Sequence, residues 1–153
     1  MDDNFAVNKS IGKYFGIISR NMHYYMNKQF QFLDLRYNEA MVLIHIDKNK
    51  NICQEDLVKI LKKEKTEIAK IIKKLMDKEY IYKIKDKKDK RIHRLYLTEK
   101  FEEIKEKLIE ILKNNSKILS KNLTDKELDF LFEILEKISE NIVNEANIIR
   151  EQD

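Results

Sequence analysis

The sequence contains very few of the residues that interrupt helices or cross-link a chain. Its 153 residues include no proline, and Gly12 and Gly16 are the only glycines. Because proline and glycine are the least favourable residues inside a helix, their scarcity favours long helices. The single cysteine, Cys53, cannot close a disulfide within one chain. With 42% hydrophobic and 38% charged residues, the composition is that of a globular protein with long solvent-facing helices.

The sequence shows no segment suited to a membrane. No apolar run reaches the ~18 residues that a transmembrane helix requires. The opening MDDNFAVNKS is acidic and polar, unlike the basic and then apolar start of a signal peptide. We therefore expect a cytoplasmic protein with no membrane partner.

Motifs for catalysis and metal binding are also missing. There is no Gly-rich phosphate loop, nucleophile elbow or pair of carboxylates at catalytic spacing. His23, His45 and His93 are scattered, and none has a cysteine or carboxylate at metal-ligand spacing. We therefore predict a protein that is not an enzyme and that has no metal and no cofactor.

Positive charge is concentrated in one part of the chain. Residues 62–94 carry 14 Lys or Arg against 6 Asp or Glu, or +8, and the remainder carries 17 against 21, or −4, which together give the net charge of +4. Within that segment, residues 83–94 hold seven basic residues and two Asp, or +5. A concentrated basic patch is what phosphate backbones or anionic membranes attract, whereas charge that serves only solubility would be spread out.

The spacing of apolar residues predicts a mainly helical chain with one β-hairpin. Strands are expected over residues 81–85 and 92–97, joined by a loop from Asp86 to Arg91. Cys53 occupies an N-cap position, and Thr124 with Glu127 forms a capping box. Helices are expected over residues 8–30, 36–48, 54–62, 65–80, 99–122 and 125–149.

The predicted helix over residues 65–80 has one apolar and one basic face. Its apolar side is formed by Ile68, Ile71, Ile72 and Leu75. Placing this side inward, at 100° per residue, directs the opposite side outward, namely Lys63, Thr66, Lys70, Lys73 and Asp77. Two short helices followed by a hairpin can present one helix to a DNA major groove and a loop to the neighbouring backbone. A Lys-rich helix face alone is more often simply solvated, but the adjacent +5 hairpin favours DNA. The predicted DNA-binding residues are Lys63, Lys65, Thr66, Glu67, Lys70, Lys73, Lys74, Lys87, Lys88, Lys90 and Arg91.

Two motifs occur together between residues 86 and 100. Asp86, Asp89, Lys90 and Arg91 fit a loop of the type D-x-x-D-R-R, and residues 97–100 read LTEK. With the preceding helices, from LVKILKK onward, this segment resembles the MarR family of winged helix-turn-helix regulators. The resemblance implies that Lys90 approaches the minor groove and that Arg91 pairs with Asp89 as a structural pair in the wing.

Three positions depart from the family pattern. Lys90 replaces the usual Arg, and because lysine lacks the planar fork of arginine, minor-groove readout is expected to be weaker or less selective. Phe101 replaces the Gly that follows LTEK, and Glu79 stands where a Gly normally ends the recognition helix. The two missing glycines bear on the local turns more than on the fold.

The sequence therefore predicts an α+β fold, mainly α with a small β-hairpin. A winged helix-turn-helix is expected over residues 34–98, and residues 1–33 and 99–153 are expected to form a helical dimerisation region. One recognition helix reads too few base pairs to find a site in a genome, so two copies would read a pseudo-palindrome. The apolar stripes of the first helix and of the last two helices suit a symmetric contact, although the last two could instead fold back on their own domain.

The expected function is a sequence-specific transcriptional regulator, a repressor that binds double-stranded DNA as a homodimer, and the resemblance alone implies that it is ligand-responsive. The small-molecule effector and its binding residues are not identified by the sequence. Two other functions fit the same residues: a non-specific architectural nucleic-acid-binding protein, and a helical protein-interaction module without a nucleic-acid role.

Three smaller features are compatible with more than one role. Cys53 at a helix N-terminus could have a lowered pKa and sense oxidants, although the resemblance places reactive cysteines of the family near the first helix. His23, Tyr24 and Tyr25 suit either an effector cavity or ordinary packing, and packing is the commoner role for a helical aromatic stripe. The pair Gly12 and Gly16 would let another helix approach closely, or it could be an accident of composition.

Overall fold

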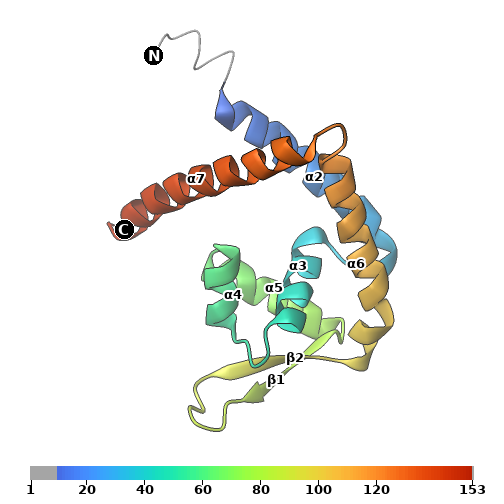
Figure 1. Cartoon of the computed structure of the whole chain (residues 1–153). Coiled ribbons are helices and arrows are strands. Elements are labelled where there is room, and N and C mark those ends of the chain that lie inside the picture. Colours follow the sequence, from blue (N-terminus) through green and yellow to red (C-terminus); the bar gives the residue numbers. More distant parts are fainter. Residues whose placement is uncertain (1–9, 153) are drawn as a thin grey trace. The chain divides into compact units, whose positions relative to one another are not determined.

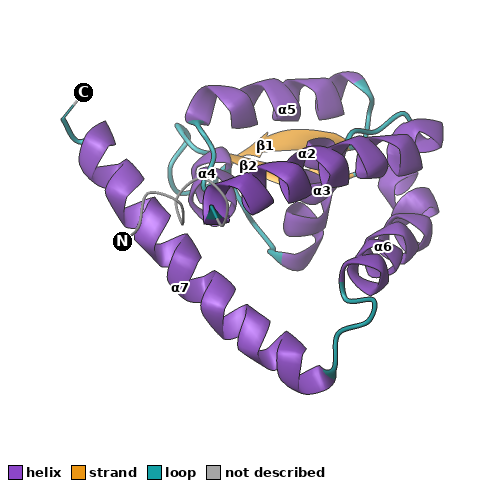
Figure 2. Cartoon of the chain, turned by 90° about the horizontal axis from the view of Figure 1, so that it is seen from above, coloured by secondary structure: helices purple, strands orange, loops and turns teal. Residues whose placement is uncertain are grey.

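The structure is a computed structural model, and it describes residues 10–152. Four helices precede a β-hairpin and two helices follow it, as predicted, with a short 3-10 turn after the first helix (Figures 1 and 2). The fold class is confirmed, and several predicted helix ends are three residues too long. The bounds are α2 (Ile11–Phe30), η1 (Gln31–Leu33), α3 (Tyr37–Lys48), α4 (Gln54–Leu61), α5 (Lys65–Asp77), β1 (Ile81–Lys85), β2 (His93–Leu97), α6 (Glu99–Leu119) and α7 (Asp125–Arg150).

α7 begins at a side-chain capping box, and α4 and α5 are each followed by a left-handed residue. At the start of α7, Thr124 Oγ1 accepts from Glu127 N (3.3 Å) and Glu127 Oε2 accepts from Thr124 N (2.8 Å), which is the predicted capping box. Lys62 follows α4 with φ 51°, and Glu79 follows α5 with φ 62°, a conformation usually taken by glycine. Glu79 therefore makes the turn for which the family uses glycine, and the departure at this position leaves the turn in place.

One hydrophobic core connects the helices from α2 to the first part of α6. Phe101, at the position of a family glycine, is fully buried in this core. α5 contacts α3, α4 and β1 (Figure 2). Its four inward residues are buried as predicted, and they fix which side of α5 faces outward. They are Ile68, Ile71, Ile72 and Leu75.

The β-hairpin over residues 81–97, here called the wing, is attached to the turn before α4. The strands pair antiparallel, with Ile81 opposite Leu97 and Lys85 opposite His93. Because side chains alternate between the two faces, Leu95 is buried and Ile84 on the other face is exposed. Leu95 N donates to the Ile52 carbonyl (2.9 Å). The loop of the wing extends away from the helices around it (Figure 1).

The chain divides into two compact units, and Leu112 is the last residue of the first. In α7, which belongs to the second unit and is described over its whole length, no residue is buried. Its exposed large apolar residues are Phe130, Leu131, Phe132, Ile142, Ile148 and Ile149. This division does not test the predicted regions 1–33, 34–98 and 99–153, and residues 1–9 and 153 lie outside the described part. None of the helices described is both long and apolar enough to cross a membrane.

Candidate nucleic-acid interface

The outer face of α5 carries most of the side chains that the sequence assigned to DNA. Lys65 and Thr66 lie in the first turn of α5, and both are exposed. Lys63 lies in the turn before α5 because the helix begins only at Lys65, after the N-cap Glu64. The outward set predicted for this helix is therefore divided between a turn and the helix itself. The remaining exposed lysines of this face are Lys70, Lys73 and Lys74.

Acidic neighbours neutralise part of this positive charge. Lys63 Nζ forms an ion pair with Glu67, one turn further along the chain, and Lys65 Nζ lies 3.7 Å from Glu55. Glu67 was predicted to bind DNA, where its carboxylate could accept from a cytosine amine. Such a contact would compete with the ion pair to Lys63. Within residues 10–152, three lysines of α5 have no carboxylate at ion-pair distance: Lys70, Lys73 and Lys74.

The end of α5 is anchored by a partly buried ion pair. Lys78, the residue after α5, donates from Nζ to Glu39 Oε2 (2.9 Å) and to the Asp34 carbonyl. Glu39 is only 3% exposed, and its Oε2 also accepts from Arg36 N (2.8 Å). These contacts connect the end of α5 to the residues that precede and begin α3. They fix the position of the predicted recognition helix at its C-terminal end.

Residues of the LTEK motif close the turn between α5 and β1. Thr98 Oγ1 donates to the Glu79 carbonyl (2.7 Å), and Lys100 Nζ donates to the Lys78 carbonyl (2.8 Å). From the other side, Tyr80 Oη donates to the Leu33 carbonyl (3.0 Å). The LTEK motif therefore has a structural role, because its side chains donate hydrogen bonds to carbonyl groups that the end of a helix leaves without partners.

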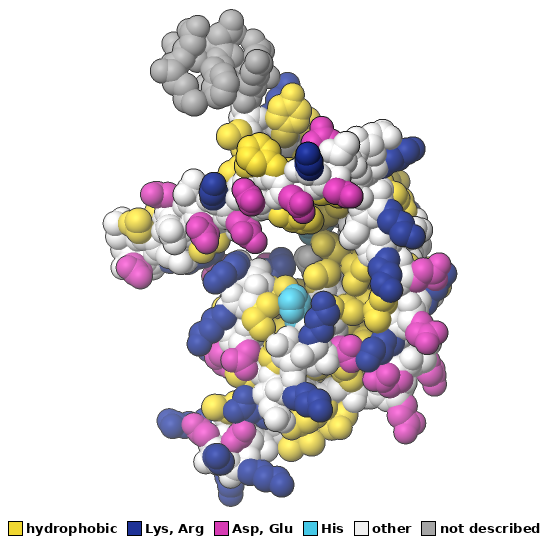
Figure 3. Space-filling model, viewed as in Figure 1, with side chains coloured by type: hydrophobic (Ala, Val, Ile, Leu, Met, Phe, Trp, Pro, Cys, Tyr) yellow, Lys and Arg dark blue, Asp and Glu magenta, His cyan; other side chains and the backbone are white. Residues whose placement is uncertain are grey.

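The wing separates its basic residues into arginines with partners and lysines without. Arg91 Nε lies 3.3 Å from Asp89 Oδ1, and Arg94 Nε donates to Asp86 Oδ2 at 2.8 Å. Figure 3 shows Lys and Arg side chains gathered over the wing, at the foot of the view. Among the described residues, five lysines of the wing have no carboxylate at ion-pair distance: Lys83, Lys85, Lys87, Lys88 and Lys90. Because the two arginines are balanced by the two aspartates, these five lysines account for the local charge of +5.

The carboxylate of Asp86 organises the loop of the wing. Its Oδ1 accepts from the backbone N–H of Asp89 (3.0 Å) and Lys88 (2.8 Å), while Oδ2 accepts from Arg94. The hydrogen bond from Asp89 N, followed by those from Arg94 and Lys88 N, lowers the pKa of Asp86 to about 2. By contrast, the side chain of Arg91 is 92% exposed, so its pair with Asp89 is expected to contribute little.

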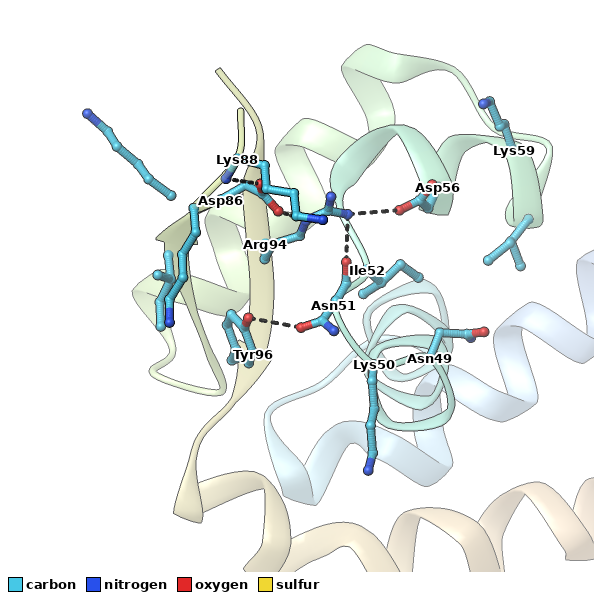
Figure 4. Close-up of a pocket in the computed structure, with 14 residues that line it drawn as sticks. Asn49, Lys50, Asn51, Ile52, Asp56, Lys59, Asp86, Lys88, Arg94 and Tyr96 are labelled. Atoms are coloured by element: carbon cyan, nitrogen blue, oxygen red, sulfur yellow. Dashed lines mark hydrogen bonds and ion pairs between the residues drawn. The ribbon is translucent and has the colours of Figure 1, made fainter. Parts of the chain in front are cut away.

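Arg94 was not among the residues predicted from the sequence, yet it joins the wing to the turn before α4. Its Nη1 donates to the Asn51 carbonyl (2.8 Å) and lies 4.0 Å from Asp56 Oδ2. Tyr96 Oη donates to Asn51 Oδ1 (3.2 Å). Figure 4 shows Arg94 between these partners, in a groove of about 1000 Å³ between the wing and residues 49–60. No sequence pattern could have identified the attachment to α4, because Asn51 and Asp56 come from a segment far from Arg94 in the sequence.

Cys53 differs from the expectation for a reactive thiol. Its side chain is buried, and desolvation raises the pKa of the thiol, although the residue caps a helix N-terminus. The sequence left a lowered pKa open as one possibility, and burial, the largest cause, shifts the pKa in the opposite direction. A thiol with a raised pKa remains protonated and reacts slowly.

The aromatic cluster on α2 does not line one shared cavity. Tyr24 borders a hollow of about 400 Å³, His23 borders a different one of about 340 Å³, and Tyr25 packs against the core. A Cβ added at Gly12 or Gly16 would meet only side chains of the same segment within the described residues.

Comparison with known proteins gives the class of this fold. A family model described as a winged helix DNA-binding domain matches residues 35–100. A solved MarR family transcriptional regulator from Listeria monocytogenes, complexed with a 26mer DNA, is 28% identical, with 99% of this chain and 96% of that chain covered and a TM-score of 0.86. The chain is a winged helix DNA-binding protein.

Two further relatives define the family. A solved MarR protein from Peptoclostridium difficile is 32% identical, with 95% of this chain and 91% of that chain covered and a TM-score of 0.84. An uncharacterised HTH-type transcriptional regulator of Bacillus subtilis, YybA, is 27% identical over 135 residues, which are 88% of this chain and 90% of the relative. The protein belongs to the MarR family of transcriptional regulators, and it is a regulator rather than an enzyme.

Proposed function

We propose that this regulator is a cytoplasmic homodimer that represses transcription by binding a pseudo-palindromic operator, and that a small ligand releases it. The observation that carries the proposal is the apolar surface that one protomer leaves exposed on α2 and α7. Monomeric soluble proteins rarely expose large apolar patches. A symmetric contact between two copies would bury these side chains and would provide two recognition helices. On α2 they are Ile11, Tyr14, Phe15, Ile17 and Ile18.

The residues proposed to contact DNA follow from exposure and from pairing. On α5, Thr66 is exposed near the start of the helix and is short enough to reach a base edge. The lysines of α5 and of the wing loop, residues 86–91, that have no carboxylate partners are proposed to contact phosphates or guanine edges. Residues already in ion pairs, namely Lys63, Lys65, Glu67 and Arg91, are expected to contribute less. The main set is Thr66, Lys70, Lys73, Lys74, Lys87, Lys88 and Lys90.

Selection of bound sequences from a random duplex pool at physiological salt tests operator recognition. We expect a consensus with two-fold symmetry, since two related recognition helices read two half-sites. An asymmetric consensus would contradict a symmetric dimer on DNA. Equal recovery of all sequences would favour the non-specific architectural protein.

Neutralising the tip of the wing tests its role in DNA binding. The variant Lys88→Gln/Lys90→Gln/Arg91→Gln should bind duplex DNA much more weakly. The slope of log K against log salt should become shallower by about 0.9 for each phosphate that the variant no longer neutralises. The matched control is Lys113→Gln/Lys117→Gln/Lys121→Gln, which removes the same charge outside the wing. If the wing variant binds DNA as the unaltered protein does, a protein-interaction module becomes the better interpretation.

A reporter gene placed behind the selected operator tests the sign of regulation. Repression predicts that expression falls when the protein is present, because the bound dimer would block the promoter. A rise in expression would identify an activator instead.

The ligand step is supported by the family resemblance and by one hollow beside α5. Side chains of α2 and α5, among them His23, Lys70 and Lys74, line about 340 Å³. A ligand can release DNA only if it binds the free protein more tightly than the DNA-bound protein. We therefore propose a melting-temperature screen of small molecules, followed by titration of each hit with and without DNA. Hits with equal affinity in both states would contradict ligand-controlled release.

A further inference from the structure

Arg94 connects three separate segments of the first unit. It lies on β2 opposite Ile84, on the face of the wing that forms one wall of the groove. Its guanidinium reaches the loop of the wing through Asp86, the turn before α4 through the Asn51 carbonyl, and α4 itself through Asp56. Figure 4 shows these three directions. Few other side chains could do this, because the planar fork of arginine offers donors on several sides.

The positive charge of Arg94 is already neutralised within the protein. Two carboxylates, Asp86 at 2.8 Å and Asp56 at 4.0 Å, lie beside it, and its side chain is only 26% exposed. A contact between Arg94 and a DNA phosphate would have to replace these interactions. The lysines of the wing have no such carboxylate partners among the described residues, so they can approach phosphates at no comparable cost.

We propose that Arg94 is a positioning residue that holds the wing in one orientation relative to α4, so that the wing lysines reach DNA while Arg94 itself does not contact it. The inference rests on the proposed DNA contacts of the wing. Asp86 is the partner through which Arg94 positions the loop, since the same carboxylate accepts from two backbone N–H groups of the loop and from Arg94. The loop and its attachment are therefore set by one carboxylate.

The substitution Asp86→Asn separates positioning from direct contact, because the two roles predict opposite results. An asparagine can still accept the two loop N–H groups with its oxygen, but its amide nitrogen cannot accept from Arg94 Nε. If Arg94 positions the wing, Asp86→Asn weakens DNA binding although it removes a negative charge. If Arg94 contacts phosphate, the substitution frees its charge and tightens binding.

Arg94→Gln gives the complementary test, measured as affinity for a duplex of random sequence over a range of salt. Positioning predicts roughly a tenfold decrease in affinity with an unchanged salt slope, whereas removal of one phosphate contact would reduce the slope by about 0.9. Because the two side chains act as a pair, the double variant Asp86→Asn/Arg94→Gln should bind no more weakly than either single variant. Lys117→Gln, which removes one positive charge at an exposed position of α6 outside the wing, is the matched control and should leave affinity nearly unchanged.

Three results would overturn the proposal: tighter binding by Asp86→Asn, a shallower salt slope for Arg94→Gln, or unchanged affinity in both variants. If Arg94→Gln does not fold, Arg94→Lys takes its place, since lysine keeps the charge but cannot reach all three partners. The random-sequence duplex makes the result independent of operator symmetry. A protein that fails to select a symmetric operator can therefore still pass or fail this test.

Discussion

The winged helix region, residues 35–100, and the last helix, α7, differ in the burial of their apolar residues. In the winged helix region the inward residues of α5 are buried by neighbouring helices of the same chain. In α7 no apolar residue is buried, and Phe132 and Ile142 are 61% and 64% accessible. The difference shows that periodicity identifies an apolar face but does not identify what covers it. The stability of the first region should therefore be a property of one protomer, and that of α7 a property of an assembly.

The largest expected effect comes from placing charge in the α7 stripe. Leu131→Glu/Ile142→Glu should abolish the proposed dimer, because burying two carboxylates at the contact is strongly unfavourable. Operator affinity should fall by roughly 10² or more, because a monomer binds one half-site whereas the dimer binds two linked half-sites at once. Sedimentation and DNA titration measure the two effects. Lys137→Glu, at an exposed position of the same helix, is the control, and a dimer that survives the double substitution would contradict the comparison.

Truncation of a core residue of α5 should act on the winged helix region alone. Ile72→Ala is expected to lower the free energy of unfolding by about 2–5 kcal/mol, because it leaves a cavity where the side chain is fully buried. Met76→Ala on the same helix, at a 38% exposed residue, should cost less than about 1 kcal/mol. Urea unfolding measures both values. A destabilisation by Ile72→Ala that depended on protein concentration would show that this core also needs the assembly.

A smaller destabilisation is expected at the anchor of α5. Glu39→Gln keeps an acceptor for Arg36 N but removes the negative partner of Lys78, and we expect the free energy of unfolding to fall by about 1–3 kcal/mol. The effect is moderated because Lys78 also donates to the Asp34 carbonyl. Glu102→Gln, at an exposed carboxylate of α6, is the control. Thermal unfolding measures the change, and equal melting temperatures for the two variants would show that the buried pair has no particular importance.

The smallest effect is a local pH dependence in the wing. The pKa of Asp86 in the folded protein, about 2, lies below its ordinary value of 3.8. A lowered pKa means that the carboxylate stabilises the folded loop above about pH 4 and that this contribution disappears as pH falls toward 2. NMR titration of the Asp86 carboxyl and the Lys88 amide should give a midpoint near 2. A midpoint near 4 would contradict the hydrogen bonds seen in the loop, and Arg94→Gln should move the midpoint upward.

Local patterns in the sequence were sufficient for the elements and for the orientation of α5. The spacing of Ile68, Ile71, Ile72 and Leu75 predicted the buried face, and the capping box predicted the start of α7. The predicted end of α5, at Tyr80, was three residues too late because Glu79 adopts a left-handed conformation. A glutamate gives no sign of that conformation, whereas a glycine would have done so.

Contacts between distant segments were not accessible to the same reasoning. The ion pair of Lys78 with Glu39 joins residues 39 apart in sequence, and Arg94 reaches Asn51 across 43 residues. Both arise from how segments distant in the sequence pack together, and a single sequence carries no signal for such pairs. The seven basic residues of the wing can be counted in the sequence, but only the fold shows which of them are already neutralised.

The left-handed residues at the ends of α4 and α5 have a consequence for protein engineering. Lys62 and Glu79 both hold a backbone conformation that disfavours any side chain, and both are exposed. Glycine or asparagine at these two sites would relax the backbone without altering the wing lysines. A more heat-resistant version of this regulator, suited to prolonged binding measurements or crystallisation with DNA, is therefore within reach of two surface substitutions.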